Sequence, residues 1–165
     1  MTAYNPHPLA GIFPMMSSDE FVSLKTDIRA NGLLEPIWLL DGQILDGRNR
    51  FKACQEVGVK PVFRDYEGDN PTAFIISLNL KRRHLSESQR AMVAAKLEGL
   101  SHGGKRRGDQ DANLHLETTR AEAASLLNVS PRSVATAKKV EELGTPELVS
   151  AVEQGNIAVS TASVL

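Results

Sequence analysis

The sequence predicts an α+β protein in which an N-terminal part with strands and helices precedes a purely helical part. Three observations lead to this fold class. Two short apolar runs, at 36–40 and 43–46, flank Asp41-Gly42, a dipeptide typical of tight hairpin turns. Helix-capping signals occur on both sides of this hairpin. From residue 118 onward the pattern is helical throughout, with few β-branched runs.

The first helix is predicted at 17–32 because the sequence marks both of its ends. Ser17 and Glu20 have the spacing of a capping box, and Gly32 is placed to end the helix in a left-handed cap. The apolar residues between these ends recur at spacings of three and four, as Phe21, Leu24 and Ile28. An amphipathic helix is therefore expected here.

After the hairpin the chain is expected to return to helix, then strand, then helix. Residues 48–58 can form a helix that stops at Gly58, and residues 60–66 read as a short strand. Residues 70–80 are helical in pattern, with Pro71 at a natural first position.

A further helix is predicted at 85–100, because Ser86 and Gln89 have the spacing of a second capping box. Residues 101–117 are rich in glycine and charge and lack apolar periodicity, which is typical of a flexible linker. The chain therefore divides into an N-terminal domain at 1–85, a connecting helix with a basic linker at 86–117, and a helical domain at 118–165.

The composition is that of an ordinary globular protein, with 165 residues of which 41% are hydrophobic and 24% charged. No run of 18 apolar residues occurs, so no membrane contact is expected. The N-terminus lacks the basic-then-apolar order of a secretory signal. Cys54 is the only cysteine, which excludes an intramolecular disulfide. We expect Cys54 to serve as a small apolar side chain on a helix face. A cytoplasmic protein is the resulting expectation.

A basic band interrupts an otherwise acidic chain. Residues 81–107 carry eight Lys and Arg against two Glu, although the whole chain has a net charge of −1. Such a band indicates a site for a polyanion, either nucleotide phosphates or a nucleic-acid backbone. A solvated helix face followed by a basic loop is the alternative.

The first candidate site lies where the second run of the hairpin ends and a helix begins. Gly47 lets the backbone approach a ligand closely, and the free amides of a helix start favour an anion. Arg48 and Arg50 supply forked donors that suit phosphate oxygens, and Asn49 adds an amide donor. The alternative is a surface ion pair between Asp46 and one of the arginines.

The second candidate site is the junction between the helices predicted at 70–80 and 85–100. Polar and cationic side chains crowd this junction, namely Asn79, Lys81, Arg82, Arg83 and His84. The second helix also offers its own N-terminus, so an anion is again favoured. Alternatively, the cations simply complement the dipole at the C-terminus of the first helix.

The third candidate is a helix-turn-helix at 119–143. Small and apolar residues stand at the offsets where two such helices pack: Ala123, Ala124, Leu127, Val129, Val134 and Ala137. Asn128 tolerates the left-handed turn conformation, Ser130 can cap the second helix, and Pro131 fits its first position. The outer side of that helix carries short or basic residues able to enter a major groove: Ser130, Arg132, Ser133, Ala135, Thr136 and Lys139. A plain helical hairpin is the alternative.

In this order, the motifs resemble those of the ParB family of chromosome and plasmid partition proteins, and most closely its ParB-like regulators of mobile elements. The resemblance rests on GLLEPIWL at 32–39, DGRNRFKA at 46–53, LNLKRRHLS at 78–86 and the helix-turn-helix. It covers nearly the whole chain. The resemblance implies a ParB/sulfiredoxin-like N-terminal domain with a small mixed sheet, followed by an all-α helix-turn-helix domain.

In this family, the segments that correspond to 46–53 and 78–86, here called the first box and the second box, bind CTP with Mg²⁺. The resemblance therefore also implies a ligand. Carried over, the nucleotide-binding residues are Gly47, Arg48, Asn49, Arg50, Asn79, Lys81, Arg82 and Arg83, and Asn79 is the candidate metal ligand. Two departures stand in the first box, where Arg48 and Asn49 replace the family's Glu and Arg. In the second box Leu78 replaces the glutamate that serves the metal and hydrolysis. The loss of that hard oxygen ligand predicts a CTPase activity that is weak or absent.

The expected function is therefore sequence-specific binding of double-stranded DNA, with a nucleotide as the switch for clamp-type engagement of a homodimer. Partition of DNA and regulation of transcription both fit, in the cytoplasm on a nucleoid or plasmid. Three alternatives stay open: a nucleotide-independent helix-turn-helix regulator, a nuclease or kinase of the ParB/sulfiredoxin fold, and an adaptor that contacts proteins. The final STASVL stops in mid-pattern, which predicts a further C-terminal segment where a dimerisation domain could lie.

Overall fold

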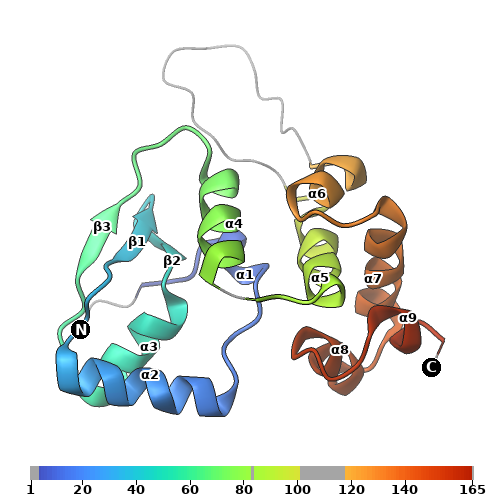
Figure 1. Ribbon diagram of the computed structural model, residues 1–165. Coiled ribbons are helices and arrows are strands. Elements are labelled where there is room, and N and C mark those ends of the chain that lie inside the picture. The colour runs from blue at the N-terminus through green and yellow to red at the C-terminus, as the bar shows by residue number, and fades with distance from the viewer. Residues whose placement is uncertain (1–3, 83, 101–117, 165) are drawn as a thin grey trace. The chain divides into compact units, whose positions relative to one another are not determined.

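The computed structural model of the protein describes residues 4–82, 84–100 and 118–164. The chain forms two compact units, Met1–Pro71 and Thr72–Leu165. Figure 1 labels the elements of both units along the chain. The predicted domains at 1–85, 86–117 and 118–165 stay a prediction, and the structural boundary at Pro71 assigns the next helix to the second unit.

The first unit contains a three-stranded sheet and three helices within its described residues. Its elements, in order, are α1 (Pro8–Gly11), α2 (Ser18–Asn31), β1 (Ile37–Leu40), β2 (Gln43–Asp46), α3 (Arg48–Val57) and β3 (Phe63–Asp65). The sheet has the order β2-β1-β3, with β1 antiparallel to β2 and parallel to β3. The prediction of an α+β protein with a small mixed sheet is therefore confirmed.

The hairpin between β1 and β2 forms at the predicted dipeptide. Asp41 and Gly42 both have positive φ, of 49° and 75°. Two consecutive residues of this kind match the right-handed twist of the flanking strands, which is why Asp-Gly is favoured at this turn. The predicted hairpin is confirmed.

Helices α2 and α3 pack against each other through the predicted apolar stripe. Ile28, Ala53 and Cys54 form a buried cluster, and the partly buried apolar residues around it are Phe21, Leu24, Leu33, Val57 and Val59. Cys54 is the buried apolar side chain expected, and burial raises the pKa of its thiol while the charge of Arg50 opposes this. The helices thus supply one core of the first unit.

The two ends of α2 differ in how well the sequence predicted them. Ser17 and Glu20 form the predicted reciprocal capping box. Gly32 has a positive φ of 75° but a ψ of −174°, so the predicted left-handed cap is wrong. The chain leaves the helix extended because it turns directly toward β1, and glycine adopts this conformation without a Cβ penalty.

The short helix α1 has no counterpart among the predicted elements. Four apolar residues in and after it are buried: Leu9, Ala10, Ile12 and Phe13. The preceding Pro6 forms an isolated parallel bridge with Ile44, which ties this segment to the outer edge of β2. Four residues are too few to show a helical period, so no sequence pattern could reveal α1.

His7 caps α1 and makes the stability of the first unit depend on pH. Its Nδ1 accepts a hydrogen bond from the backbone N–H of Leu9 at 3.2 Å, which requires a neutral imidazole. Burial lowers the pKa of His7 below its ordinary 6.5, and the nearby charge of Asp41 opposes this. The folded state therefore binds fewer protons than the unfolded chain just below this pH.

We expect the free energy of unfolding to fall as the pH is lowered through 6.5 toward the lower pKa of folded His7. The variant His7→Asn can still cap the helix but does not titrate. The free energy of unfolding of His7→Asn, relative to that of wild type, should therefore increase as the pH is lowered from about 7.5 to about 5. Denaturant unfolding at each pH measures this difference. An unchanged difference between the two proteins across that interval would contradict the prediction.

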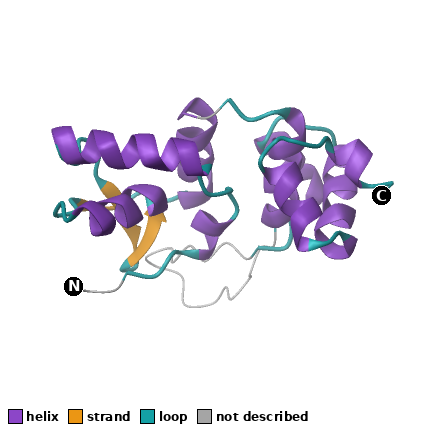
Figure 2. Ribbon diagram, turned by 90° about the horizontal axis from the view of Figure 1, so that it is seen from below, coloured by secondary structure: helices purple, strands orange, loops and turns teal. Residues whose placement is uncertain are grey.

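The second unit is helical throughout its described residues, as predicted for 118–165. Its elements are α4 (Pro71–Arg82), α5 (Glu87–Leu97), α6 (Arg120–Leu126), α7 (Pro131–Leu143), α8 (Pro146–Glu153) and α9 (Val159–Ala162). Figure 2 colours the helices of both units purple and the strands, which belong to the first unit, orange. None of the described helices is both long and apolar enough to cross a lipid bilayer. The predicted linker at 101–117 lies outside the described residues.

Helix α5 is the centre of the helical packing in the second unit. It contacts α6, α7, α8 and α9, and most of its inward residues are small or apolar: Ala91, Met92, Val93, Ala94, Ala95 and Leu97. Ser86 and Gln89 form the predicted capping box at its start. Polar contacts also hold it to the C-terminal helices, since Gln89 donates to the Glu153 carbonyl at 2.9 Å and Lys96 pairs with the Glu153 side chain.

Candidate functional sites

Gly47 joins β2 to α3 in a conformation that favours glycine. Its φ of 103° and ψ of 23° place it in the left-handed region, and α3 begins at the next residue. The predicted change from strand to helix at this position is confirmed. No side chain caps the first turn of α3 in the described structure. The glycine is therefore required by the backbone turn itself.

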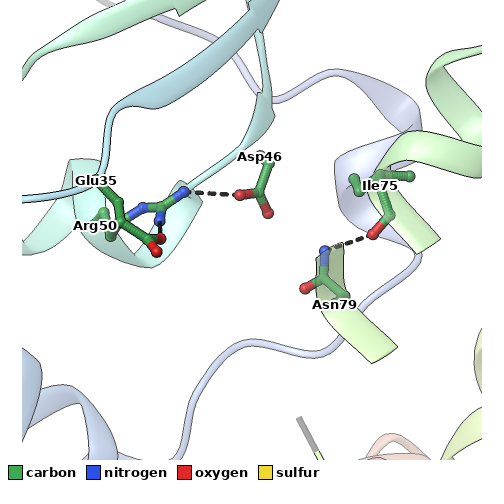
Figure 3. A network of polar contacts seen from close by, with 5 residues as sticks. All are labelled: Glu35, Asp46, Arg50, Ile75 and Asn79. Carbon is green, nitrogen blue, oxygen red and sulfur yellow. Dashed lines mark hydrogen bonds and ion pairs between the residues drawn. The ribbon is translucent and has the colours of Figure 1, made fainter. Parts of the chain in front are cut away.

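The guanidinium of Arg50 folds back over Gly47 and pairs with two carboxylates. Its Nη2 contacts Asp46 Oδ2 at 2.7 Å, and its Nη1 contacts Glu35 Oε2 at 2.5 Å (Figure 3). The side chains of Arg50 and Asp46 are only 13% and 9% exposed, whereas that of Glu35 is 57% exposed. The ion pair with Asp46 that the alternative expected is thus present, but it is largely buried and does not lie on the surface.

This ion pair fills the space above the glycine. A Cβ added at Gly47 would lie 3.1 Å from both Nε and Nη2 of Arg50. The Nε of Arg50 is buried and has no hydrogen-bond partner among the described residues. A guanidinium with a remaining donor is suited to an additional oxygen acceptor. A phosphate could reach this group only if the side chains around it move.

Arg48 and Asn49 hold the chain that leads from α1 to α2. Arg48 Nη2 donates to the carbonyl of Phe13 at 2.5 Å, and the buried Asn49 accepts from the N–H of Met16 through Oδ1 at 3.4 Å. Both side chains therefore stabilise the N-terminal segment against the start of α3. Their predicted role in nucleotide binding stays a prediction.

The second box lies on α4 and the residues that follow it. Asn79 is buried, and its Nδ2 donates to the carbonyl of Ile75 at 2.9 Å, one turn earlier (Figure 3). Lys81 is exposed. Arg83 and the side chain of Arg82 lie outside the described residues. Because the two boxes belong to different compact units, their predicted meeting around one triphosphate stays a prediction.

The predicted metal site finds no ligand cluster in the described part of the chain. No group of three or more His, Cys, Asp and Glu side chains there could hold a metal ion. The amide nitrogen of Asn79 donates a hydrogen bond within its own helix. Asn79 is the residue that the family resemblance indicates as a candidate metal ligand. Mg²⁺ usually keeps several waters and is bound through one or two carboxylates together with substrate phosphates, so the role of Asn79 as a metal ligand stays a prediction.

Helices α6 and α7 pack through the residues predicted for a helix-turn-helix. Five of the six predicted positions are at most 1% exposed, namely Ala123, Ala124, Leu127, Val134 and Ala137, and Val129 is half-buried. Asn128 has a φ of 51°, so the turn uses the predicted left-handed residue. Alanines at these positions allow the two helices to approach closely, and α5 packs against both.

Several hydroxyl groups on α7 are engaged by the protein itself. Ser130 Oγ accepts from the N–H of Ser133 at 3.0 Å and caps the helix. Ser133 Oγ contacts Ser130 Oγ at 2.9 Å and donates to Glu87 Oε1 at 3.3 Å. Thr136 Oγ1 donates to the carbonyl of Arg132 at 2.9 Å.

Two cations on the same helix are available to a ligand. Arg132 and Lys139 are exposed, and neither forms an ion pair with any residue that the structure describes. They lie seven residues apart, which is two helical turns, and therefore share one face of α7. The acidic residues Glu141 and Glu142 follow only at the C-terminal end. Positive charge is thus concentrated on the N-terminal and central turns.

Sequence reasoning missed Glu35 and Glu87, which engage the predicted site residues Arg50 and Ser133. Glu35 precedes β1, and the antiparallel pairing of Trp38 with Asp46 brings the start of β1 beside the end of β2. The register of the predicted hairpin could therefore have indicated that Glu35 lies near Asp46 and Arg50. No comparable signal pointed to Glu87, because its contact with Ser133 depends on how α5 packs against α7.

Comparisons with solved structures find similarity to the C-terminally truncated chromosome-partitioning protein ParB from Caulobacter crescentus. The complex of that protein with CTP-γ-S is 22% identical, with 92% of this chain and 81% of that chain covered and a TM-score of 0.37. The complex with the centromeric parS site is 21% identical, with coverage of 91% and 74% and a TM-score of 0.35. No protein-family model and no curated protein matches the chain. These low TM-scores leave the function to be inferred from the chain's own residues.

Proposed function

We propose that this chain is a ParB-like, sequence-specific DNA-binding protein that inserts α7 into the major groove of double-stranded DNA. The observation that carries this proposal is the packing of α6 against α7 around the turn at Asn128. That packing buries the small residues of both helices and leaves Arg132 and Lys139 exposed on one face. A helix held in this way on a rigid three-helix core can enter the groove with its side chains in fixed positions.

The experiment is selection of duplexes from a random-sequence pool with the full chain, followed by titration at several salt concentrations. A specific site should be enriched, and affinity should fall steeply with salt because cations of α7 displace counterions from phosphates. Failure to enrich any sequence would overturn the proposal and favour the alternative of an adaptor that contacts other proteins. Metal-dependent cleavage or phosphotransfer of the selected duplex would favour a nuclease or kinase.

A second function is proposed for the first unit, namely binding of a nucleotide, with CTP the first to be tested. The pattern of Gly47 to Arg50 supports it, because a helix start without a side-chain cap and two guanidinium groups suit phosphate oxygens. In this proposal the phosphate displaces the exposed Glu35 from Arg50 while Asp46 keeps the guanidinium oriented. The nucleotide then acts as a switch if it prefers one arrangement of a homodimer. The proposal contains no step through a metal.

The variant Glu35→Gln tests this exchange. Removal of the competing carboxylate should raise nucleotide affinity about twofold to fivefold, since an exposed ion pair contributes up to about 1 kcal/mol. Calorimetric titration with all four nucleoside triphosphates measures it. The matched control is Glu56→Gln, which removes an exposed carboxylate paired with Lys25 on the same unit and should leave affinity unchanged. If the wild-type protein binds no nucleotide, and if its affinity for DNA is the same with and without each nucleotide, the chain is a nucleotide-independent regulator.

A further inference from the structure

The outer face of α7 has a chemical order that limits which bases it can read. Four residues lie on this face at helical spacings of three and four: Arg132, Ala135, Thr136 and Lys139. The cations stand at the two ends, and the two residues between them are short. A helix of this kind presents long donors at its ends and small groups where it lies nearest the base edges.

The hydroxyl of Thr136 is turned toward its own helix. Because Oγ1 donates to the carbonyl of Arg132, the hydroxyl proton is engaged within the helix. Thr136 keeps acceptor lone pairs on its oxygen, and its γ-methyl stays available as an apolar contact. Its neighbour Ala135 is half-buried and has only a methyl group to offer. The centre of this face therefore presents methyl groups between two cations.

The hydroxyl of Ser133 is equally committed. It lies between Ser130 Oγ and Glu87 Oε1 and completes the contact between the start of α7 and the start of α5. Of the predicted groove residues, Arg132 and Lys139 therefore supply the side-chain donors that no protein group holds among the described residues. Neither of them can supply an apolar contact at the middle of the face.

We propose that Thr136, together with Ala135, reads the C5-methyl groups of thymine in the DNA site. This inference rests on the proposed function of α7 as a groove-binding helix. Thymine carries the only methyl group that a standard base pair displays in the major groove, and small apolar side chains are its natural contacts. Arg132 fits guanine at the adjoining end of the site, because its guanidinium can donate to O6 and N7 together. The site thus places thymine beside guanine.

The experiment uses the full chain and the duplex selected from the random pool, with each thymine replaced in turn by deoxyuridine. This change removes one methyl group and alters no hydrogen-bonding atom. At one or more positions we expect affinity to fall about fourfold, the fold-change that corresponds to one buried methyl group. Two variants assign the effect to Thr136. Thr136→Ser keeps the hydroxyl and should bind thymine and deoxyuridine equally at the position that Thr136 contacts, whereas Thr136→Val keeps a methyl and should retain the discrimination there.

The outcomes separate this inference from the proposed function. Enrichment of a specific duplex that wild type binds equally well with deoxyuridine at every position would overturn the reading of thymine and leave DNA binding intact. Loss of affinity in Thr136→Val with no loss in Thr136→Ser would also overturn it, because the hydroxyl would then be the reading group. Failure to enrich any duplex would overturn both.

Discussion

Replacement of Gly47 by alanine should lower the free energy of unfolding by about 3 kcal/mol, because it combines backbone strain with a steric clash. The φ of 103° lies in a region that residues with a Cβ rarely adopt. The new Cβ would meet Arg50 Nε and Nη2 at 3.1 Å and Ile37 Cγ1 at 3.3 Å. Relief of the clash would push the guanidinium away from the buried carboxylate of Asp46. Denaturant unfolding of the full chain measures the loss.

Two other glycines separate the two causes. Gly58 ends α3 with a φ of 73°, and a Cβ there would meet nothing within 4 Å, so Gly58→Ala should cost only about 1 kcal/mol of strain. Gly11 has neither a positive φ nor a neighbour within 4 Å, so Gly11→Ala should be neutral or slightly stabilising. Equal losses for Gly47→Ala and Gly58→Ala would show that the position of Arg50 above Gly47 contributes nothing.

Replacement of Arg132 by alanine should weaken binding of the selected duplex about tenfold to a hundredfold, as expected for loss of one bidentate contact to a base. Binding of unrelated sequences should fall much less, so discrimination at one base pair should relax. The structural reason is that Arg132 is exposed on α7 and has no ion-pair partner among the described residues. Titration of the selected duplex and of single base-pair variants measures both effects.

Two controls test whether the effect belongs to the helix or to charge alone. Arg29→Ala removes the same charge from an exposed position on α2 and should leave the affinity for DNA unchanged. Lys139→Ala should reduce affinity for all sequences alike and lower the salt dependence by about one counterion, if its ammonium contacts phosphate. A wild-type pattern of base preferences in Arg132→Ala would contradict the assignment of α7 as the recognition helix.

The fold could be predicted largely from signals that act over a few residues. Ser17 with Glu20 and Ser86 with Gln89 each satisfy helix-start amides within one turn, so their spacing alone predicts the cap. Asp41-Gly42 sets its own turn in the same local way. The left-handed residue Asn128 likewise follows from its own side chain.

The site was harder to predict, because its contacts join residues that are distant in sequence. Arg50 pairs with Glu35, which is 15 residues away in the sequence, and Asn49 accepts a hydrogen bond from the N–H of Met16, which is 33 residues away. A sequence shows that an arginine is present but not which acceptor holds it. The same limit applies to Ser133, whose hydroxyl contacts Glu87 46 residues earlier in the chain.

The sequence by itself determined where the longer helices and the hairpin lie, which of their faces are apolar, and which side chains carry positive charge. These features depend on hydrogen bonds and periodicities within three or four residues. Only the tertiary structure decided that Arg50 is neutralised by two carboxylates above Gly47, and that α7 keeps Arg132 and Lys139 exposed while engaging its hydroxyls. The physical reason is that the pairing of a charge or a donor depends on the path of the folded chain, because any of several acceptors could satisfy it.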